Sequence, residues 1–240
     1  MIKNYTRLLF IVFYVMASHA QGIQTFTLAN FDLKNQVKFC LVSTDYGKEE
    51  YDFNKKGLLT KSVTRYNDKD YDVVHYKYTN GTLTEKRSES YRNHTFDAST
   101  SIAHFYTIDS TDNLTIQERI FSYDKAFLDE YVYEYDAKGL LSTIRRTNNE
   151  GTDITRVERK KEKGELTTTH MLNGVPLKSV RTSTLRPKNR PEQKIVLTKE
   201  YLKGQANEAY EEVFDKQGRL MAKQEFEFNM ENQKFEPTVR

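Results

Sequence analysis

The sequence predicts an all-β protein: an antiparallel β-hairpin meander that forms one large curved sheet after a cleaved signal peptide. Turn signals recur along the chain, the segments between them alternate in polarity, and nothing after residue 20 has the period of an amphipathic helix. The number of turns predicts about 14 strands. Because twisted sheets of this size usually curl or split, a curled sheet and a half-barrel remain as alternatives.

Residues 1–20 have the pattern of a secretory signal peptide. Lys3 and Arg7 supply positive charge, residues 8–17 are apolar, and Ser18 and Ala20 are small residues before a cleavage site. The apolar run is shorter than the roughly 20 residues that span a bilayer. We therefore expect an exported protein, periplasmic or extracellular, with no transmembrane segment after cleavage.

Residues 21–47 are expected to form an N-terminal capping segment, and residues 48–240 the β-hairpin repeat domain. The capping segment is less repeat-like, and it predicts either a strand pair at the first edge of the sheet or an extended segment packed across it. Cys40 is the only cysteine, so no disulfide framework is expected. Its apolar neighbours favour a buried thiol, with an intermolecular disulfide or a nucleophile as alternatives.

A short motif repeats along the second domain. The run from Tyr133 to Leu141 resembles residues 51–59, and a third copy lies at 213–220. In each copy an aromatic strand ends at Asp or Asn, whose side chain can bond the backbone two residues on. A glycine three residues later can adopt positive φ, and a new strand follows it. Weaker copies lie at 76–83, 109–114 and 161–166, and each copy predicts a hairpin.

The core motif, Tyr-x-Tyr-Asp-x-x-Gly-Leu-Leu at 133–141, resembles the YD-repeat (Rhs-like) β-hairpin family and related short secreted repeat proteins of Bacteroidota. The resemblance covers roughly residues 50–228, counted as repeats. It implies a hairpin sheet. It brings no catalytic residues with it, and the chain has too few hairpins to form the shell that long members of the family build.

Tyrosines lie at alternate positions of two predicted strands. Tyr131, Tyr133 and Tyr135 share one face, and Tyr76 and Tyr78 share a face of another strand. Rigid aromatic side chains with a polar tip make good contact surfaces, so these five residues are the candidate binding site for a glycan or a protein. The alternative is that the same stripe forms the core. The alternation along the strands predicts a sheet with one aromatic face and one charged face.

The remaining composition gives little sign of catalysis. The 37 basic and 34 acidic residues leave a net charge of +3, which falls to +1 without Lys3 and Arg7, so nucleic acid is not an expected partner. We find no metal-ligand spacing, no nucleophile elbow and no phosphate-binding glycine loop, and we predict no catalytic residue, no metal and no cofactor. A hydrolase site assembled across strands around His94 or His104 is the enzymatic alternative.

These observations predict an exported, non-enzymatic β-repeat protein. It would act as a binding or structural module in the bacterial envelope or the extracellular space, with an envelope protein or glycan as its partner. The alternative is a periplasmic carrier or chaperone, whose curved aromatic face holds an amphiphile or a client protein.

Overall fold

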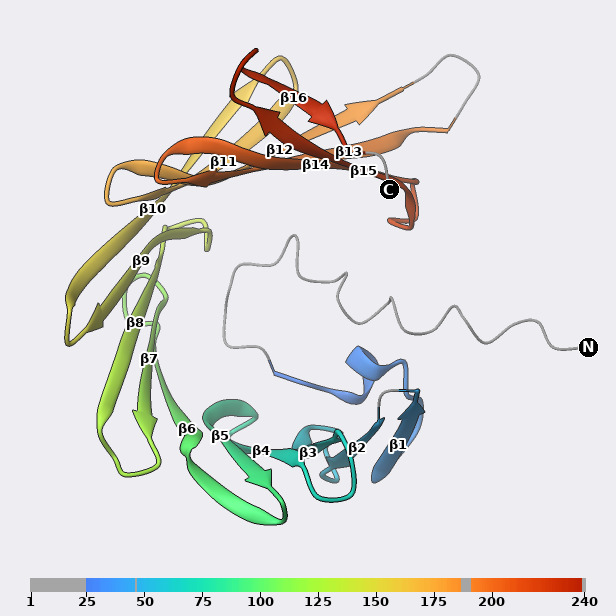
Figure 1. Ribbon diagram of the computed structural model, residues 1–240, viewed down its shortest axis with the longest axis vertical. Coiled ribbons are helices and arrows are strands. Elements are labelled where there is room, and N and C mark those ends of the chain that lie inside the picture. Colours follow the sequence, from blue (N-terminus) through green and yellow to red (C-terminus); the bar gives the residue numbers. More distant parts are fainter. Residues whose placement is uncertain (1–24, 46, 187–190, 239–240) are drawn as a thin grey trace, which may run out of the picture. The chain divides into compact units, whose positions relative to one another are not determined.

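The computed structural model describes residues 25–45, 47–186 and 191–238, so the predicted signal peptide lies outside the described residues. The described chain forms 16 strands that follow one another in a single antiparallel meander, with every strand next to its neighbours in sequence (Figure 1). Among the described strands, the first and the last each have one neighbour, so the sheet is not closed. The predicted fold class is confirmed, with two strands more than the count of turns suggested.

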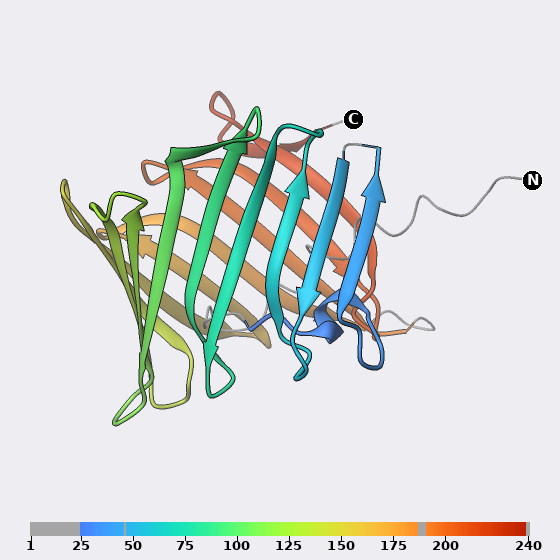
Figure 2. The ribbon, with the colours of Figure 1, turned by 90° about the horizontal axis from the view of Figure 1, so that it is seen from below.

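The contacts divide the chain into two compact units, residues 1–141 with 145–152 and residues 142–144 with 153–240. Figure 2 shows the first eight strands side by side in chain order. They are β1 (Phe39–Thr44), β2 (Gly47–Phe53), β3 (Leu59–Arg65), β4 (Tyr71–Thr79), β5 (Thr82–Arg92), β6 (Thr95–Asp109), β7 (Thr115–Ser122) and β8 (Phe127–Tyr135). The remaining strands are β9 (Leu141–Asn148), β10 (Gly151–Glu162), β11 (Glu165–Leu172), β12 (Val175–Leu185), β13 (Gln193–Leu202), β14 (Gln205–Phe214), β15 (Leu220–Asn229) and β16 (Lys234–Pro237).

The three good copies of the sequence motif fold into the same hydrogen-bonded turn. The Oδ1 atom of Asp136 accepts hydrogen bonds from the backbone nitrogens two and four residues on, each at 2.9 Å. Asn54 and Asp215 accept the equivalent pairs of bonds in their own turns. The glycine that follows has a φ of 71° after Asp136, in the left-handed region where a residue without Cβ is favoured. The predicted turn chemistry is therefore confirmed.

Several other hairpins close with two residues that both have positive φ. Asn80 and Gly81 have φ of 53° and 86°, and Asn173 and Gly174 have 48° and 87°. Turns of this kind match the right-handed twist of the strands that they join, and Asn-Gly is the favoured pair. The sequence thus specifies the hairpin ends locally.

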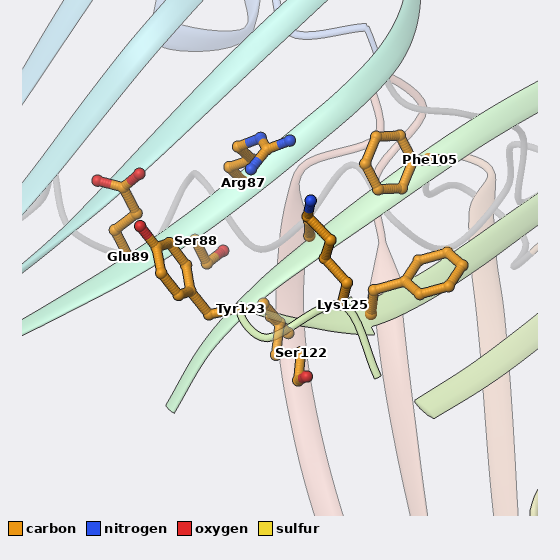
Figure 3. Close-up of a pocket in the computed structure, with 10 residues that line it drawn as sticks. Arg87, Ser88, Glu89, Phe105, Ser122, Tyr123 and Lys125 are labelled. Carbon is orange, nitrogen blue, oxygen red and sulfur yellow. The ribbon is translucent and has the colours of Figure 1, made fainter. Parts of the chain in front are cut away.

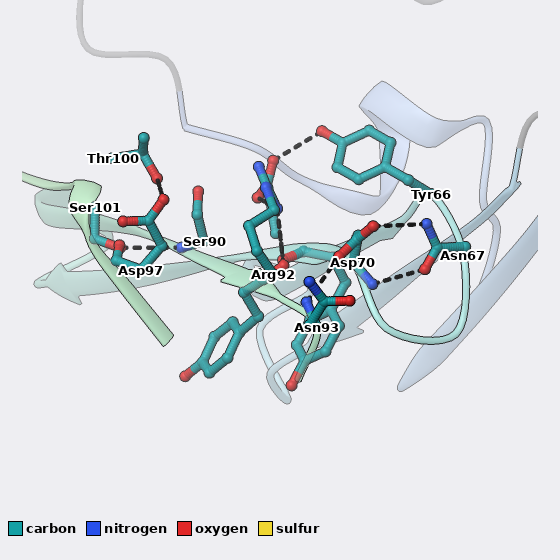
Figure 4. Close-up of polar contacts among 12 residues, drawn as sticks. Tyr66, Asn67, Asp70, Ser90, Arg92, Asn93, Asp97, Thr100 and Ser101 are labelled. Carbon is teal, nitrogen blue, oxygen red and sulfur yellow. Dashed lines mark hydrogen bonds and ion pairs between the residues drawn. The ribbon is translucent and has the colours of Figure 1, made fainter. Parts of the chain in front are cut away.

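Two neighbouring hairpin ends in the first unit are bonded to each other (Figure 4). The backbone nitrogen of Asn93 donates to Asp70 at 2.8 Å, and that of His94 donates to the carbonyl of Lys69 at 2.9 Å. Arg92 forms an ion pair of 2.9 Å with Asp72 beside them. His94 therefore belongs to the β5–β6 turn, which is hydrogen-bonded to the β3–β4 turn.

Both faces of the first unit carry aromatic side chains, contrary to the expectation of one aromatic and one charged face. Tyr71 and Tyr91 stack with ring centroids 4.7 Å apart, and the series continues through Phe96 to Tyr123. Tyr76 lies on the opposite face from Tyr71, because the alternation of β4 is regular between them. The aromatic rings pack against side chains of neighbouring strands, so cross-strand pairs on each face supply packing.

The buried apolar side chains are spread along the sheet. In the first unit they are Phe53, Leu58, Leu59, Val63, Val73, Leu83, Ala103, Ile116, Tyr135 and Leu141, and in the second Val157, Val196, Ala209 and Phe214. Most apolar side chains of the described strands are only partly buried. Cys40 is among these half-buried residues and has a free thiol.

The described residues before β1, drawn in blue, lie against one face of strands β2–β4 (Figure 1). A single 3-10 turn, η2 (Leu28–Phe31), places Phe31 with its ring centroid 4.7 Å from that of Tyr51. Phe26 contacts Tyr76 at 5.5 Å, and its carbonyl accepts a hydrogen bond from the backbone of Leu59. This segment therefore packs across the sheet, and β1 follows it as an edge strand.

Candidate binding surface

Five tyrosines of the first unit lie on the same face of the sheet and define what we call the tyrosine row. The strand register places them on this face from alternating strands: Tyr51 in β2, Tyr76 in β4, Tyr106 in β6, and Tyr131 and Tyr133 in β8. Burial raises the pKa of Tyr51 and of Tyr106, and the nearby hydroxyl of Tyr76 adds to both shifts. Tyrosines of four alternate strands thus share one face of the sheet.

The end of the row on β8 is a stacked pair. The rings of Tyr131 and Tyr133 lie 6.2 Å apart at 15°, and both residues are half-buried. The guanidinium of Arg146 lies 5.8 Å from the centroid of Tyr131, within the range of a cation–π contact. Arg146 also donates a hydrogen bond of 2.7 Å to Asp129, which holds its charged group in place. The pair therefore offers two nearly parallel rings beside an oriented cation.

Glu118 is the centre of a polar network on the same face as the row, between β6 and β8. Its Oε1 lies 2.7 Å from Nδ1 of His104, and its Oε2 accepts a hydrogen bond of 3.1 Å from the hydroxyl of Tyr133. The side chain of Tyr106 also donates to this carboxylate. Glu118 and His104 have only 14% and 11% of their side chains exposed. One carboxylate from β7 therefore orients groups from β6 and β8.

The network sets the charge states of its members. Burial alone would raise the pKa of Glu118, but the donors His104, Tyr106 and Tyr133 outweigh it and lower the pKa. Burial, reinforced by the carboxylate charge, raises the pKa of Tyr106 and Tyr133. Glu118 is therefore ionised and both tyrosines are neutral at physiological pH. The hydroxyls of Tyr106 and Tyr133 are therefore neutral groups that Glu118 holds in place by hydrogen bonds.

The two predicted site residues of β4 are partly covered by the N-terminal segment. The ring of Tyr76 meets Phe26 edge-on. The hydroxyl of Tyr78 is buried beside the Phe26 backbone, outside the geometry of an ordinary hydrogen bond, and burial raises the pKa of Tyr78 to about 12. Both residues are half-buried.

The third predicted residue of β8 lies in the core. Tyr135 is 3% exposed, whereas Tyr131 and Tyr133 are half-buried. Its backbone nitrogen donates to the carbonyl of Leu114 at 3.0 Å, at the end of the paired region. All three tyrosines share one face of β8, and the structure leaves Tyr131 and Tyr133 half-buried but encloses Tyr135.

Sequence reasoning did not select Glu118 or Tyr106. The spacing of two residues between His104 and Tyr106 indicates that they share a face. However, the pairing of Tyr106 with Glu118, and of Glu118 with Tyr131, depends on the register of two different hairpins. The chain contains 34 acidic residues, and nothing local distinguishes this carboxylate from the others.

A shallow pocket of about 290 Å³ lies at β5–β7, lined in part by side chains of the face opposite the tyrosine row (Figure 3). Phe105 and Phe121 form its apolar part, with ring centroids 5.8 Å apart. Arg87 lies 5.9 Å from the ring of Phe105, and the ammonium group of Lys125 points toward the same space. The pocket thus combines aromatic walls with two cations, and Glu89 is the acidic residue in its lining.

Within the described ranges, no group of three or more His, Cys, Asp or Glu residues is placed to hold a metal ion. Among the same residues, no helix has the length and apolar character needed to cross a membrane. His104 is engaged by Glu118, and His94 lies in a turn, so the structure does not bring these two histidines into one group.

Comparison of the chain with protein-family models and with curated proteins finds no match.

Proposed function

We propose that this chain is an exported, non-enzymatic β-repeat protein that acts as a binding module in the bacterial envelope or the extracellular space. The stacked pair Tyr131 and Tyr133 is its contact surface, and the partner is an envelope protein or a glycan. The observation that carries the proposal is the fixed position of this pair, because the carboxylate of Glu118 on the neighbouring strand accepts a hydrogen bond from Tyr133. Rigid rings lose little conformational entropy on binding, which favours them as contact residues.

The chemistry of the row supports recognition over catalysis. The raised pKa values of Tyr106 and Tyr133 make these hydroxyls poor nucleophiles at neutral pH, while they remain hydrogen-bond donors and acceptors. The imidazole of His104 already donates to a carboxylate. Aromatic faces beside neutral hydroxyls and a cation suit a polar ligand with apolar patches, such as a sugar ring or a protein loop.

We further propose that the chain is a short member of the YD-repeat (Rhs-like) family, as found among secreted proteins of Bacteroidota. The recurrence of one turn, with the same hydrogen bonds at Asn54, Asp136 and Asp215, supports this relationship. The motif specifies a turn, so the relationship accounts for the hairpin architecture. It does not identify the ligand, which depends on the surface residues.

The test is capture of a partner from an envelope extract of the native host. Immobilised wild-type protein is compared with Tyr131→Ser and with Tyr123→Ser, because Tyr123 is a half-exposed tyrosine of the other aromatic series. Recovered material is identified by mass spectrometry and glycan analysis. We expect a saturable partner that Tyr131→Ser loses and Tyr123→Ser keeps.

Circular dichroism and urea unfolding must first establish that both variants fold. If folded Tyr131→Ser captures the same partner with unchanged affinity, the contact surface lies elsewhere. Turnover of envelope glycans or peptides by wild-type protein, abolished by His104→Ala in a folded variant, would replace the binding proposal by the hydrolase alternative.

The pocket between Phe105 and Phe121 favours a second candidate, a carrier that holds a small anionic amphiphile. The two cations near the aromatic walls would meet the head group, and the rings would meet its apolar part. Titration with a fluorescent fatty acid tests this function. Saturable uptake that Lys125→Glu weakens supports the carrier, and the absence of saturable uptake by folded protein counts against it.

A further inference from the structure

We propose that β1 is a dimerisation edge, at which two copies of this chain pair their β1 strands in antiparallel orientation and extend one sheet into the other. This interaction surface is separate from the tyrosine row, and the proposal does not depend on the function proposed above.

The chemistry of β1 is that of an unprotected edge. Its six residues, Phe39–Thr44, include no charge and no proline. Phe39 is 51% exposed and Leu41 is 52% exposed, both on the same face of the strand. Native edge strands usually carry charges, prolines or bulges that prevent pairing with another chain. β1 has none of these within its six residues.

The backbone groups of β1 are arranged for a second partner. The nitrogen of Phe53 donates to the carbonyl of Lys38 at 2.8 Å, so the backbone groups of Lys38 point toward β2. Because these groups alternate in direction along an antiparallel strand, those of Phe39, Leu41 and Ser43 point away from β2. Among the described residues no strand pairs with this side of β1.

The opposite edge of the sheet is protected. β16 is only four residues long, and it contains Lys234, Glu236 and Pro237. Proline cannot donate to a ladder, and inserted charges disfavour pairing. Pairing of β1 with β16 of another copy would also produce an open-ended series, whereas pairing of β1 with β1 closes after two copies. The contrast between the two edges therefore favours the closed arrangement.

The charges that flank β1 favour a second copy as the partner. Lys38 precedes the strand and Asp45 follows it, and both residues are exposed. In an antiparallel pair of identical strands, each Lys38 lies at the end that carries Asp45 of the other copy. The two side chains do not lie directly opposite each other, but like charges are kept at opposite ends. A parallel pair would instead place like charges together, which is unfavourable. The uncharged centre adds no repulsion between the copies.

Symmetry restricts the register. A two-fold axis normal to the sheet keeps each residue on its own face, so only residues of like parity can lie opposite one another. The register centred on Leu41 pairs Phe39 with Ser43 of the other copy and uses all three outward-pointing residues of each strand. It places Cys40 opposite Val42, so the dimer needs no disulfide.

The test begins with sedimentation equilibrium on protein purified from an exporting host, in reducing buffer. We expect a reversible monomer–dimer equilibrium. Leu41→Lys places two lysines opposite each other at the centre of the interface and should weaken the dimer about tenfold or more. The matched control is Leu177→Lys in β12, because this leucine is 44% exposed and lies in a strand with neighbours on both sides. The control should dimerise like the wild type.

Site-directed crosslinking then locates the contact. In a Cys40→Ser background, Leu41→Cys should give a covalent dimer with a short bis-maleimide, and Phe235→Cys in β16 should not. A wild-type protein that stays monomeric at all attainable concentrations overturns the proposal. Equal weakening by both lysine variants, open-ended oligomers, or crosslinking through β16 would each do the same.

Discussion

The imidazole of His104 and the carboxylate of Glu118 lie 2.7 Å apart on neighbouring strands, and together they anchor the face that carries the tyrosine row. A carboxylate with 14% of its side chain exposed loses much of its hydration, and hydrogen bonds must replace it. His104, Tyr106 and Tyr133 supply these bonds. The position of the proposed contact pair thus depends on a carboxylate of the neighbouring strand.

Glu118→Gln should destabilise the protein. The amide keeps the size of the side chain but loses the charge that two tyrosines and a histidine stabilise, so we expect the free energy of unfolding to fall by about 1–3 kcal/mol. Urea unfolding at pH 7 measures it. The control is Glu208→Gln at an exposed position of β14, which should change the stability by less than about 0.5 kcal/mol. Equal effects of the two changes would contradict the role of the network.

The contribution of Glu118 should depend on pH. Its pKa is lower in the folded protein than in the unfolded chain, despite burial, because His104, Tyr106 and Tyr133 hydrogen-bond to the charged form. The stabilisation is then fully present above the ordinary glutamate pKa of about 4.3 and is lost as the pH falls through the lower folded value. The difference in unfolding free energy between wild type and Glu118→Gln should shrink on acidification below this pKa. If this difference between the two proteins did not change with pH, the stabilisation would not come from the ionised carboxylate of Glu118.

Ser101→Ala tests the irregular pairing of β5 with β6 (Figure 4). Ser101 is 1% exposed; its Oγ accepts a hydrogen bond of 3.0 Å from the backbone of Ser90 and donates one of 2.7 Å to the carbonyl of Asp97. Alanine leaves both backbone groups without these bonds, so we expect a loss of about 1–3 kcal/mol in thermal or urea unfolding. Ser99→Ala removes an exposed hydroxyl that also bonds Asp97 and should cost less than half as much.

Gly139 tests whether the repeated turn is selected by backbone conformation. No atom lies within 4 Å of a Cβ added there, so the cost of Gly139→Ala comes from its φ of 71° and should be about 1 kcal/mol. Gly139→Asn should cost less, because asparagine tolerates this region. Gly47→Ala should cost more than either, because its Cβ would lie 2.0 Å from the carbonyl oxygen of Arg65. Equal costs for alanine and asparagine at position 139 would contradict this explanation.

Much of the architecture could be predicted from local signals. The Asp136 turn, the Asn80-Gly81 turn and the alternation of Tyr131 and Tyr133 each involve residues close in sequence, and each appears in the structure as the residue types require. A meander connects only consecutive strands, so correct hairpins are nearly sufficient to give the strand order. The expectation of one charged face was wrong, since Tyr71 and Tyr91 form an aromatic pair opposite the tyrosine row.

By itself the sequence determined the all-β class, the turn positions and the residues that share a face along each strand, because these follow from φ preferences and the two-residue period. Only the tertiary structure decided which side chains of different strands become neighbours. It paired Tyr106 with Glu118, covered Tyr76 with Phe26 and enclosed Tyr135, while Tyr131 stayed half-buried. These outcomes depend on register and on contacts between residues far apart in sequence, and one residue of slip would exchange the two faces of a strand.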